Sequence, residues 1–144
     1  MCVEAFRKIR LLLVDDQPAV LRGLRMWLAL EPDLMVVGEA ASGAEVGGLL
    51  DSVDPDVVLM DVEMPGLDGV DATAVVHALR PALPVVILSL HDDIETRARA
   101  WVAGAAAFVA KHEVEPVLVR TIRDVARWHR QPGSPAGPLS DSHS

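Results

Sequence analysis

The stretch that decides the fold is Asp56-Val57-Val58-Leu59-Met60-Asp61-Val62-Glu63-Met64-Pro65-Gly66-Leu67-Asp68-Gly69. Its apolar run, residues 57–60, is typical of a strand that is buried on both faces of a parallel sheet. Asp61 ends this run, and the carboxyl end of a buried strand is where open α/β sheets bind ligands. Pro65-Gly66 predicts a turn behind it. We therefore expect one acidic group at the edge of a sheet, held by a rigid strand.

Four further apolar runs predict strands, at residues 9–14, 34–40, 84–89 and 105–110. Segments with helical spacing or helix signals alternate with the strands, at residues 18–28, 44–50, 70–79, 94–102 and 113–130. Five buried strands that alternate with five helices predict a single α/β domain. Its fold class is a doubly wound parallel sheet covered by helices on both faces.

Composition narrows the function classes. The chain has 144 residues, which fits one domain, and a formal net charge of −8. This charge argues against nucleic-acid binding by this chain, because phosphate binding needs a positive field. No apolar stretch approaches the ~20 residues of a membrane span, so we expect no membrane association. The single cysteine, Cys2, is consistent with a reducing, cytoplasmic location.

Polar residues follow four of the predicted strands at their carboxyl ends. They are Asp15-Asp16, Asp61, Ser89 and Lys111. In a parallel sheet these ends share one edge, so three carboxylates are expected to converge there and to repel one another. A hard cation such as Mg²⁺ relieves this repulsion, and a lysine and a serine can hold phosphoryl oxygens. The set therefore indicates phosphoryl transfer, with an aspartate as a possible nucleophile.

Each of these residues taken singly also has an ordinary explanation. An acidic pair after a strand, such as Asp15-Asp16, is typical of a solvated loop or a helix cap. A lone Ser89 or Lys111 at a strand end carries little information. The prediction depends on the combination, in which each group closes a different strand.

The sequence resembles the receiver domain of bacterial two-component response regulators over roughly residues 8–130. The resemblance is carried by Leu13-Val14-Asp15-Asp16, the run from Leu59 to Gly69, Leu88-Ser89, and Gly104-Ala105 through Phe108 to Lys111. It implies the flavodoxin-like sheet with strand order 2-1-3-4-5. Residues 131–144 are rich in Pro, Gly and Ser, and we expect a flexible tail or the start of an interdomain linker there.

The resemblance also implies roles at the acidic edge. Asp61 matches the phosphoacceptor, which takes a phosphoryl group from a sensor histidine kinase. Asp15 and Asp16 match the acidic pair that holds Mg²⁺ together with Asp61. The backbone carbonyl of Glu63 is expected to complete the metal site.

Three further positions match groups that read the modification. Ser89 and Lys111 match the hydroxyl and the lysine that contact the phosphoryl group, and Phe108 matches the aromatic switch position. Phosphorylation is expected to draw Ser89 toward the new group and let Phe108 turn inward. Self-association through the fourth helix, fifth strand and fifth helix should then change.

Two side chains are hypothesised to set the lifetime of the phosphorylated state. His91 comes two residues after Ser89, in a loop expected to overlook the phosphate, and Glu63 is the matching position on the other side. Hydrolysis needs a water in line with the phosphorus, and flanking side chains guide or exclude that water.

Val37-Gly38-Glu39-Ala40 and the run from Leu88 to Asp93 are similar to the NarL/FixJ subfamily, whose output is a LuxR-type helix-turn-helix. The residues beyond Arg130 are too few and too rich in Pro and Gly for a recognition helix with its support. We therefore expect a receiver cut from a transcription factor, with a free-standing receiver that acts by protein contacts as the alternative.

Two other functions are alternatives to a phosphorylated receiver. A Mg²⁺-dependent phosphatase with an aspartate nucleophile, similar to the haloacid dehalogenases, typically carries a second aspartate two positions after the first, where this chain has Glu63. A pseudo-receiver is disfavoured by the intact acidic pair, Ser89 and Lys111. The sequence therefore predicts a phosphorylation-activated switch and not a turnover enzyme.

Overall fold

The computed structural model describes residues 8–64 and 68–130. Its five strands are β1 (Ile9–Val14), β2 (Leu34–Ala40), β3 (Val57–Asp61), β4 (Val85–Ser89) and β5 (Ala107–Ala110). Its helices are α1 (Pro18–Leu28), α2 (Gly43–Leu49), α3 (Gly69–Leu79), α4 (Ile94–Ala103) and α5 (Val119–Arg130). The strands form one parallel sheet in the order β2-β1-β3-β4-β5, which confirms the predicted fold.

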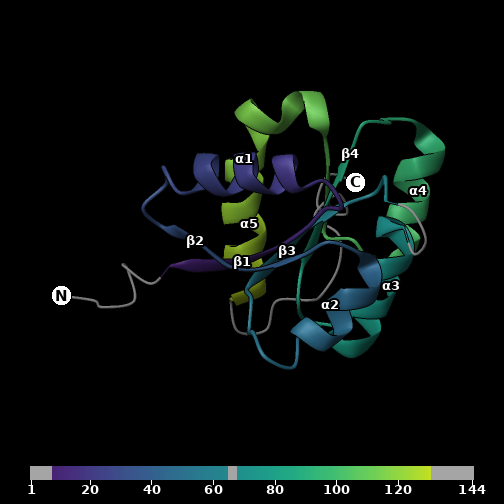
Figure 1. The fold of residues 1–144 in the computed structure, drawn as a ribbon. Coiled ribbons are helices and arrows are strands. Elements are labelled where there is room, and N and C mark those ends of the chain that lie inside the picture. The colour runs from purple at the N-terminus through teal and green to yellow at the C-terminus, as the bar shows by residue number, and fades with distance from the viewer. Residues whose placement is uncertain (1–7, 65–67, 131–144) are drawn as a thin grey trace.

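Alternate residues of the central strands point to opposite faces of the sheet. Leu11 and Leu13 belong to a core shared with α1 and α5, whereas Leu12 and Val14 belong to a core shared with α2, α3 and α4. Figure 1 shows these two helical layers on either side of the sheet. Burial on both faces explains why β1, β3 and β4 are nearly continuous apolar runs.

Local sequence explains where several helices begin and end. Pro18 occupies the first turn of α1, and Asp68 caps α3 by accepting a hydrogen bond of 2.9 Å from the Asp71 amide. Asp93 caps α4 by accepting a hydrogen bond of 3.1 Å from the Thr96 amide. Gly104 ends α4 in the left-handed region at φ 104°.

Helix α4 departs from the amphipathic pattern that its sequence suggests. Ile94 and Val102 are 86% and 89% exposed, and Ala100 is the buried residue of this helix. Trp101 is half-buried against the core formed with α2 and α3. The apolar residues of α4 therefore do not form one buried face.

The start of the last helix also differs from the prediction. Lys111–Glu113 form a 3-10 turn, Val114–Leu118 form a π-helical turn, and regular α-helix begins at Val119. Pro116 has no backbone N–H, so this segment cannot form a complete α-helical hydrogen-bond ladder. Leu118, Ile122 and Val125 lie in the core that α5 shares with α1.

Some predictions fall on residues outside the described part of the chain. The turn at Pro65-Gly66 and the tail or linker at 131–144 are among them, so the domain bounds 8–130 stay a prediction. Within the described ranges, no helix combines the length and the apolarity that crossing a membrane requires.

Gly69→Ala is expected to destabilise the protein, because a Cβ atom at residue 69 would overlap the carbonyl oxygen of Asp61. Helix α3 starts so close to the end of β3 that the two would have to separate, at a cost of about 1–3 kcal/mol in the free energy of unfolding.

Gly48→Ala is the matched control, because among the described residues nothing lies within 4 Å of the Cβ position. This substitution in α2 should stabilise the protein by about 0.5–1 kcal/mol. Urea denaturation followed by circular dichroism measures both. A Gly69→Ala protein as stable as the parent would contradict the close approach of α3 and β3.

Candidate functional site

Three carboxylates meet at the carboxyl edge of the sheet. Asp15 and Asp16 follow β1, and Asp61 ends β3. One oxygen of each lies within 4.8 Å of those of the other two. Asp15 and Asp61 are each 2% exposed, and Oδ1 of Asp16 is buried without a hydrogen-bond partner among the described residues. The structure therefore brings together the three acidic residues that the sequence predicted to converge.

Burial and mutual repulsion disfavour ionisation of this cluster. Burial is the largest cause that raises the pKa of Asp61, to about 6, and the negative charges of Asp15 and Glu63 add to it. Burial likewise raises the pKa of Asp15, although a hydrogen bond of 2.9 Å from the Gln17 amide opposes the shift. The cluster is therefore short of positive charge.

Lys111 supplies the positive charge that faces this cluster. It follows β5, and its Nζ lies 2.6 Å from Oδ1 of Asp61 and 3.5 Å from Oε1 of Glu63. Burial lowers the pKa of Lys111, but contact with Asp61 and the nearby carboxylates outweigh burial and raise it. Lys111 therefore stays a cation between Asp61 and Glu63.

Ser89 lies at the end of β4 and is fully buried. Its hydroxyl donates a hydrogen bond of 2.8 Å to Oε2 of Glu63 and accepts one of 3.0 Å from the His91 amide. The Leu90 amide donates to Oε1 of Glu63 at 3.1 Å. The Glu63 side chain thus connects Ser89 to Lys111, a contact that the sequence reasoning missed.

The family model of the response regulator receiver domain matches residues 11–123. The chain belongs to this family. The uncharacterized transcriptional regulatory protein YxjL of Bacillus subtilis is 37% identical over 120 residues, which make up 83% of this chain and 55% of that protein. The chain spans about half the length of the curated relatives that it matches.

Solved receivers have the same fold. A LuxR-family response regulator from Aurantimonas superposes with a TM-score of 0.80 at 31% identity, covering 94% of this chain and 98% of that one. The receiver domain of the putative response regulator NarL from Mycobacterium tuberculosis gives 0.76 at 34% identity, covering 84% and 98%. The matched relatives are mostly transcriptional regulators, with a methylesterase among them. They support a receiver of the NarL/FixJ type.

Phe108 lies on β5 of the receiver and is partly buried. The guanidinium of Arg97, on α4, stands 4.6 Å from the centre of its ring, a cation–π distance. Arg97 also pairs with Asp92 at 2.6 Å. Sequence patterns do not indicate this contact, because Arg97 and Phe108 belong to different elements.

His91 is the predicted site residue that contributes least to the arrangement. Its side chain is exposed, and its backbone amide makes the hydrogen bond to the Ser89 hydroxyl. The other residues predicted for the acidic edge, including Glu63 and Lys111, contact one another directly or lie in the carboxylate cluster.

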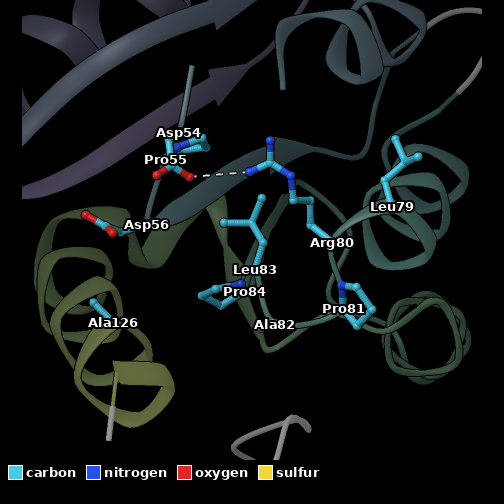
Figure 2. A pocket seen from close by; sticks show the side chains of 10 residues that line it. All are labelled: Asp54, Pro55, Asp56, Leu79, Arg80, Pro81, Ala82, Leu83, Pro84 and Ala126. Carbon is cyan, nitrogen blue, oxygen red and sulfur yellow. Dashed lines mark hydrogen bonds and ion pairs between the residues drawn. The ribbon is translucent and has the colours of Figure 1, made fainter. Parts of the chain in front are cut away.

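A groove of about 410 Å³ lies at the opposite edge of the sheet (Figure 2). It is lined by Asp54–Asp56 before β3, Leu79–Pro84 before β4, and Ala126 of α5. In Figure 2 the Arg80 guanidinium reaches across it to Asp54, at 3.3 Å. The groove contains none of the residues of the acidic edge, so the two sites are separate.

Asp61→Asn is expected to stabilise the receiver near neutral pH in the absence of divalent cations. Asp61 has a folded pKa of about 6 against its ordinary value of 3.8. Between these values the native state binds more protons than the unfolded state, so the stability of the parent falls as pH rises through this window. Asparagine cannot ionise, and it should recover up to about 3 kcal/mol of unfolding free energy.

Asp33→Asn is the control of opposite sign. A hydrogen bond from Arg123 is the main cause that lowers the pKa of Asp33, so ionisation of Asp33 stabilises the fold and its removal should destabilise it. Urea titrations across the range from about pH 4 to 7 measure both variants. A parallel pH dependence of Asp61→Asn and the parent would show that Asp61 is not the strained carboxylate.

Proposed function

We propose that Asp61 is the phosphoacceptor of this receiver and takes its phosphoryl group from a phosphohistidine of a sensor histidine kinase. The observation that carries this proposal is a buried carboxylate that clusters with an acidic pair and contacts Lys111. Receivers work with such kinases as a family, so the kinase is the expected partner.

The transfer uses one oxygen of Asp61 as the nucleophile. That oxygen forms a bond to phosphorus while the bond between phosphorus and the histidine nitrogen of the kinase breaks, and the electron pair leaves with the imidazole. Lys111 already holds Oδ1 of Asp61, so the other oxygen is the one we assign to the attack. Lys111 and Ser89 would then receive terminal phosphoryl oxygens.

We assign a Mg²⁺ site to Asp15, Asp16, Asp61 and the backbone carbonyl of Glu63. Its chemistry fits, because hard oxygen ligands converge there and Oδ1 of Asp16 is buried without a partner among the described residues. When bound, the ion neutralises the charge that accumulates between the carboxylates and the phosphoryl group. Mg²⁺ removal should therefore prevent phosphorylation.

Switching is assigned to Ser89 and Phe108. Movement of the Ser89 hydroxyl toward the phosphoryl group would allow Phe108 to turn inward, away from Arg97, and would change the surface of α4, β5 and α5. The exposed Ile94 and Val102 of α4 supply apolar area for contact on that surface. We expect self-association of the receiver through it.

We further propose that the receiver controls transcription through an output domain in a longer protein. The relatives that support this proposal are transcriptional regulators about twice as long as the matched region. A stand-alone receiver that acts by protein contacts is the second candidate. Phosphatase turnover is disfavoured by Glu63, which is bound to Ser89 and Lys111 where a general acid would be needed.

Glu63 and His91 are proposed to set the lifetime of the phosphorylated state in a cytoplasmic protein. The Glu63 carboxylate contacts Lys111 and Ser89, and the His91 amide contacts the Ser89 hydroxyl, so both residues adjoin the groups assigned to the phosphoryl oxygens. Side chains next to a phosphoryl group can guide or exclude the water that hydrolyses it.

Acetyl phosphate should add one phosphoryl group to the parent only when Mg²⁺ is present. Asp61→Asn should lose this label, because its amide is not a nucleophile, while Asp71→Asn, at an exposed position of α3, should keep it. Intact-protein mass spectrometry measures the label, which should be acid-stable and base-labile. Undiminished labelling of Asp61→Asn would contradict the assignment.

Ser89→Ala should keep phosphorylation of Asp61 but lose the response to it, since chemistry and switching depend on different residues. Beryllofluoride, which mimics the phosphoryl group, should change the sedimentation of the parent and the fluorescence of Trp101 on α4. Ser52→Ala, an exposed serine after α2, is the control and should respond like the parent. A normal response of Ser89→Ala would overturn the coupling route.

A further inference from the structure

The Glu63 side chain is bound by three donors at once. Its carboxylate accepts hydrogen bonds from the Ser89 hydroxyl at 2.8 Å and the Leu90 amide at 3.1 Å, and Lys111 Nζ lies 3.5 Å away. Ser89 is fully buried, whereas the side chain of Glu63 is 26% exposed, at the rim of the site. A hydroxyl, an amide and an ammonium that converge on one carboxylate form an anion site.

The same donors are needed by the modification. Ser89 and Lys111 are the two groups assigned above to the phosphoryl oxygens, and in this structure both are engaged by Glu63. The hydrogen of the Ser89 hydroxyl points to Glu63, while its oxygen accepts from the His91 amide. Since a hydroxyl has one hydrogen to donate, Ser89 cannot serve both anions together.

We propose that Glu63 is an internal anion that occupies the phosphoryl position of the unphosphorylated receiver, so that modification of Asp61 requires the carboxylate to be displaced. This inference rests on the proposed function, and it adds a regulatory contact that holds Ser89 and Lys111 in their unmodified arrangement. Glu63 is then a positioning residue, which acts through the two groups that read the phosphoryl group.

The exchange is favourable for electrostatic reasons. A phosphoryl group brings a charge of about −1.5 to −2, against −1 for the carboxylate, so it binds the ammonium and the hydroxyl more strongly. The displaced carboxylate has solvent beside it, because the Glu63 side chain is already 26% exposed. Without the phosphoryl group, the carboxylate returns and holds the Ser89 hydroxyl away from Asp61.

Two variants distinguish occupation of the anion site by the Glu63 carboxylate from the general effect of a negative charge at residue 63. Glu63→Ala removes both the carboxylate and its reach, and Glu63→Asp keeps the charge but shortens the side chain by one methylene. If the carboxylate occupies the site, both should bind beryllofluoride about tenfold more tightly than the parent at saturating Mg²⁺, which corresponds to one competing charge-assisted contact. Glu95→Gln, which removes an exposed charge from the first turn of α4, should bind like the parent.

A second measurement needs no phosphoryl donor. The Leu90 amide donates to Glu63, so its ¹H–¹⁵N resonance in the metal-free protein should shift in Glu63→Ala and Glu63→Asp and stay in place in Glu95→Gln. Beryllofluoride should shift the same resonance in the parent. Mass spectrometry of each variant after acetyl phosphate treatment reports separately whether Asp61 is modified.

The inference would be overturned if both Glu63 variants bound beryllofluoride with the affinity of the parent. It would also be overturned if only Glu63→Ala bound beryllofluoride more tightly, because that result would indicate a general charge effect. An unmoved Leu90 resonance in both variants would overturn it as well. Absence of beryllofluoride binding and of Asp61 labelling in every protein, the parent included, would overturn the proposed function itself.

Discussion

The crowding of carboxylates at one edge of the sheet is the constraint on which the rest of the site depends. The topology brings Asp15, Asp16 and Asp61 together because β1 and β3 are parallel neighbours, and burial then denies water to two of them. One lysine, Lys111, faces this excess of negative charge. The folded chain therefore carries an unfavourable electrostatic term that a cation or a modification can relieve.

Rigidity at that edge comes from how closely the backbone packs behind it. Helix α3 starts so near the end of β3 that only glycine fits at residue 69, and Asp61 belongs to a strand with both faces buried. The crowded carboxylates at this edge lower the stability of the fold locally, while the two apolar cores on either side of the sheet stabilise it.

Much of this arrangement could be predicted from the sequence. Buried parallel strands are continuous apolar runs, and their carboxyl ends must share an edge, so convergence of Asp15, Asp61 and Lys111 follows from the pattern. Side-chain contacts could not be predicted this way. Glu63 reaches Ser89, and Arg97 reaches Phe108, only because of the angles at which neighbouring elements pack. The exposed faces of α4 were missed because apolar residues at helical spacing do not say which side meets the core.

The attachment of α4 has a consequence for the dynamics of the domain. Ala100 is the fully buried residue of α4, and Trp101 is half-buried against the same core. Charged groups add further contacts, from Arg97 to Asp92 and Phe108 and from Arg99 to Asp68. Salt screens exposed ion pairs but hardly affects apolar burial. A rise in ionic strength should therefore loosen α4 while leaving the sheet intact. Hydrogen exchange would then record faster local opening of this helix at high salt, within a fold that salt does not unfold.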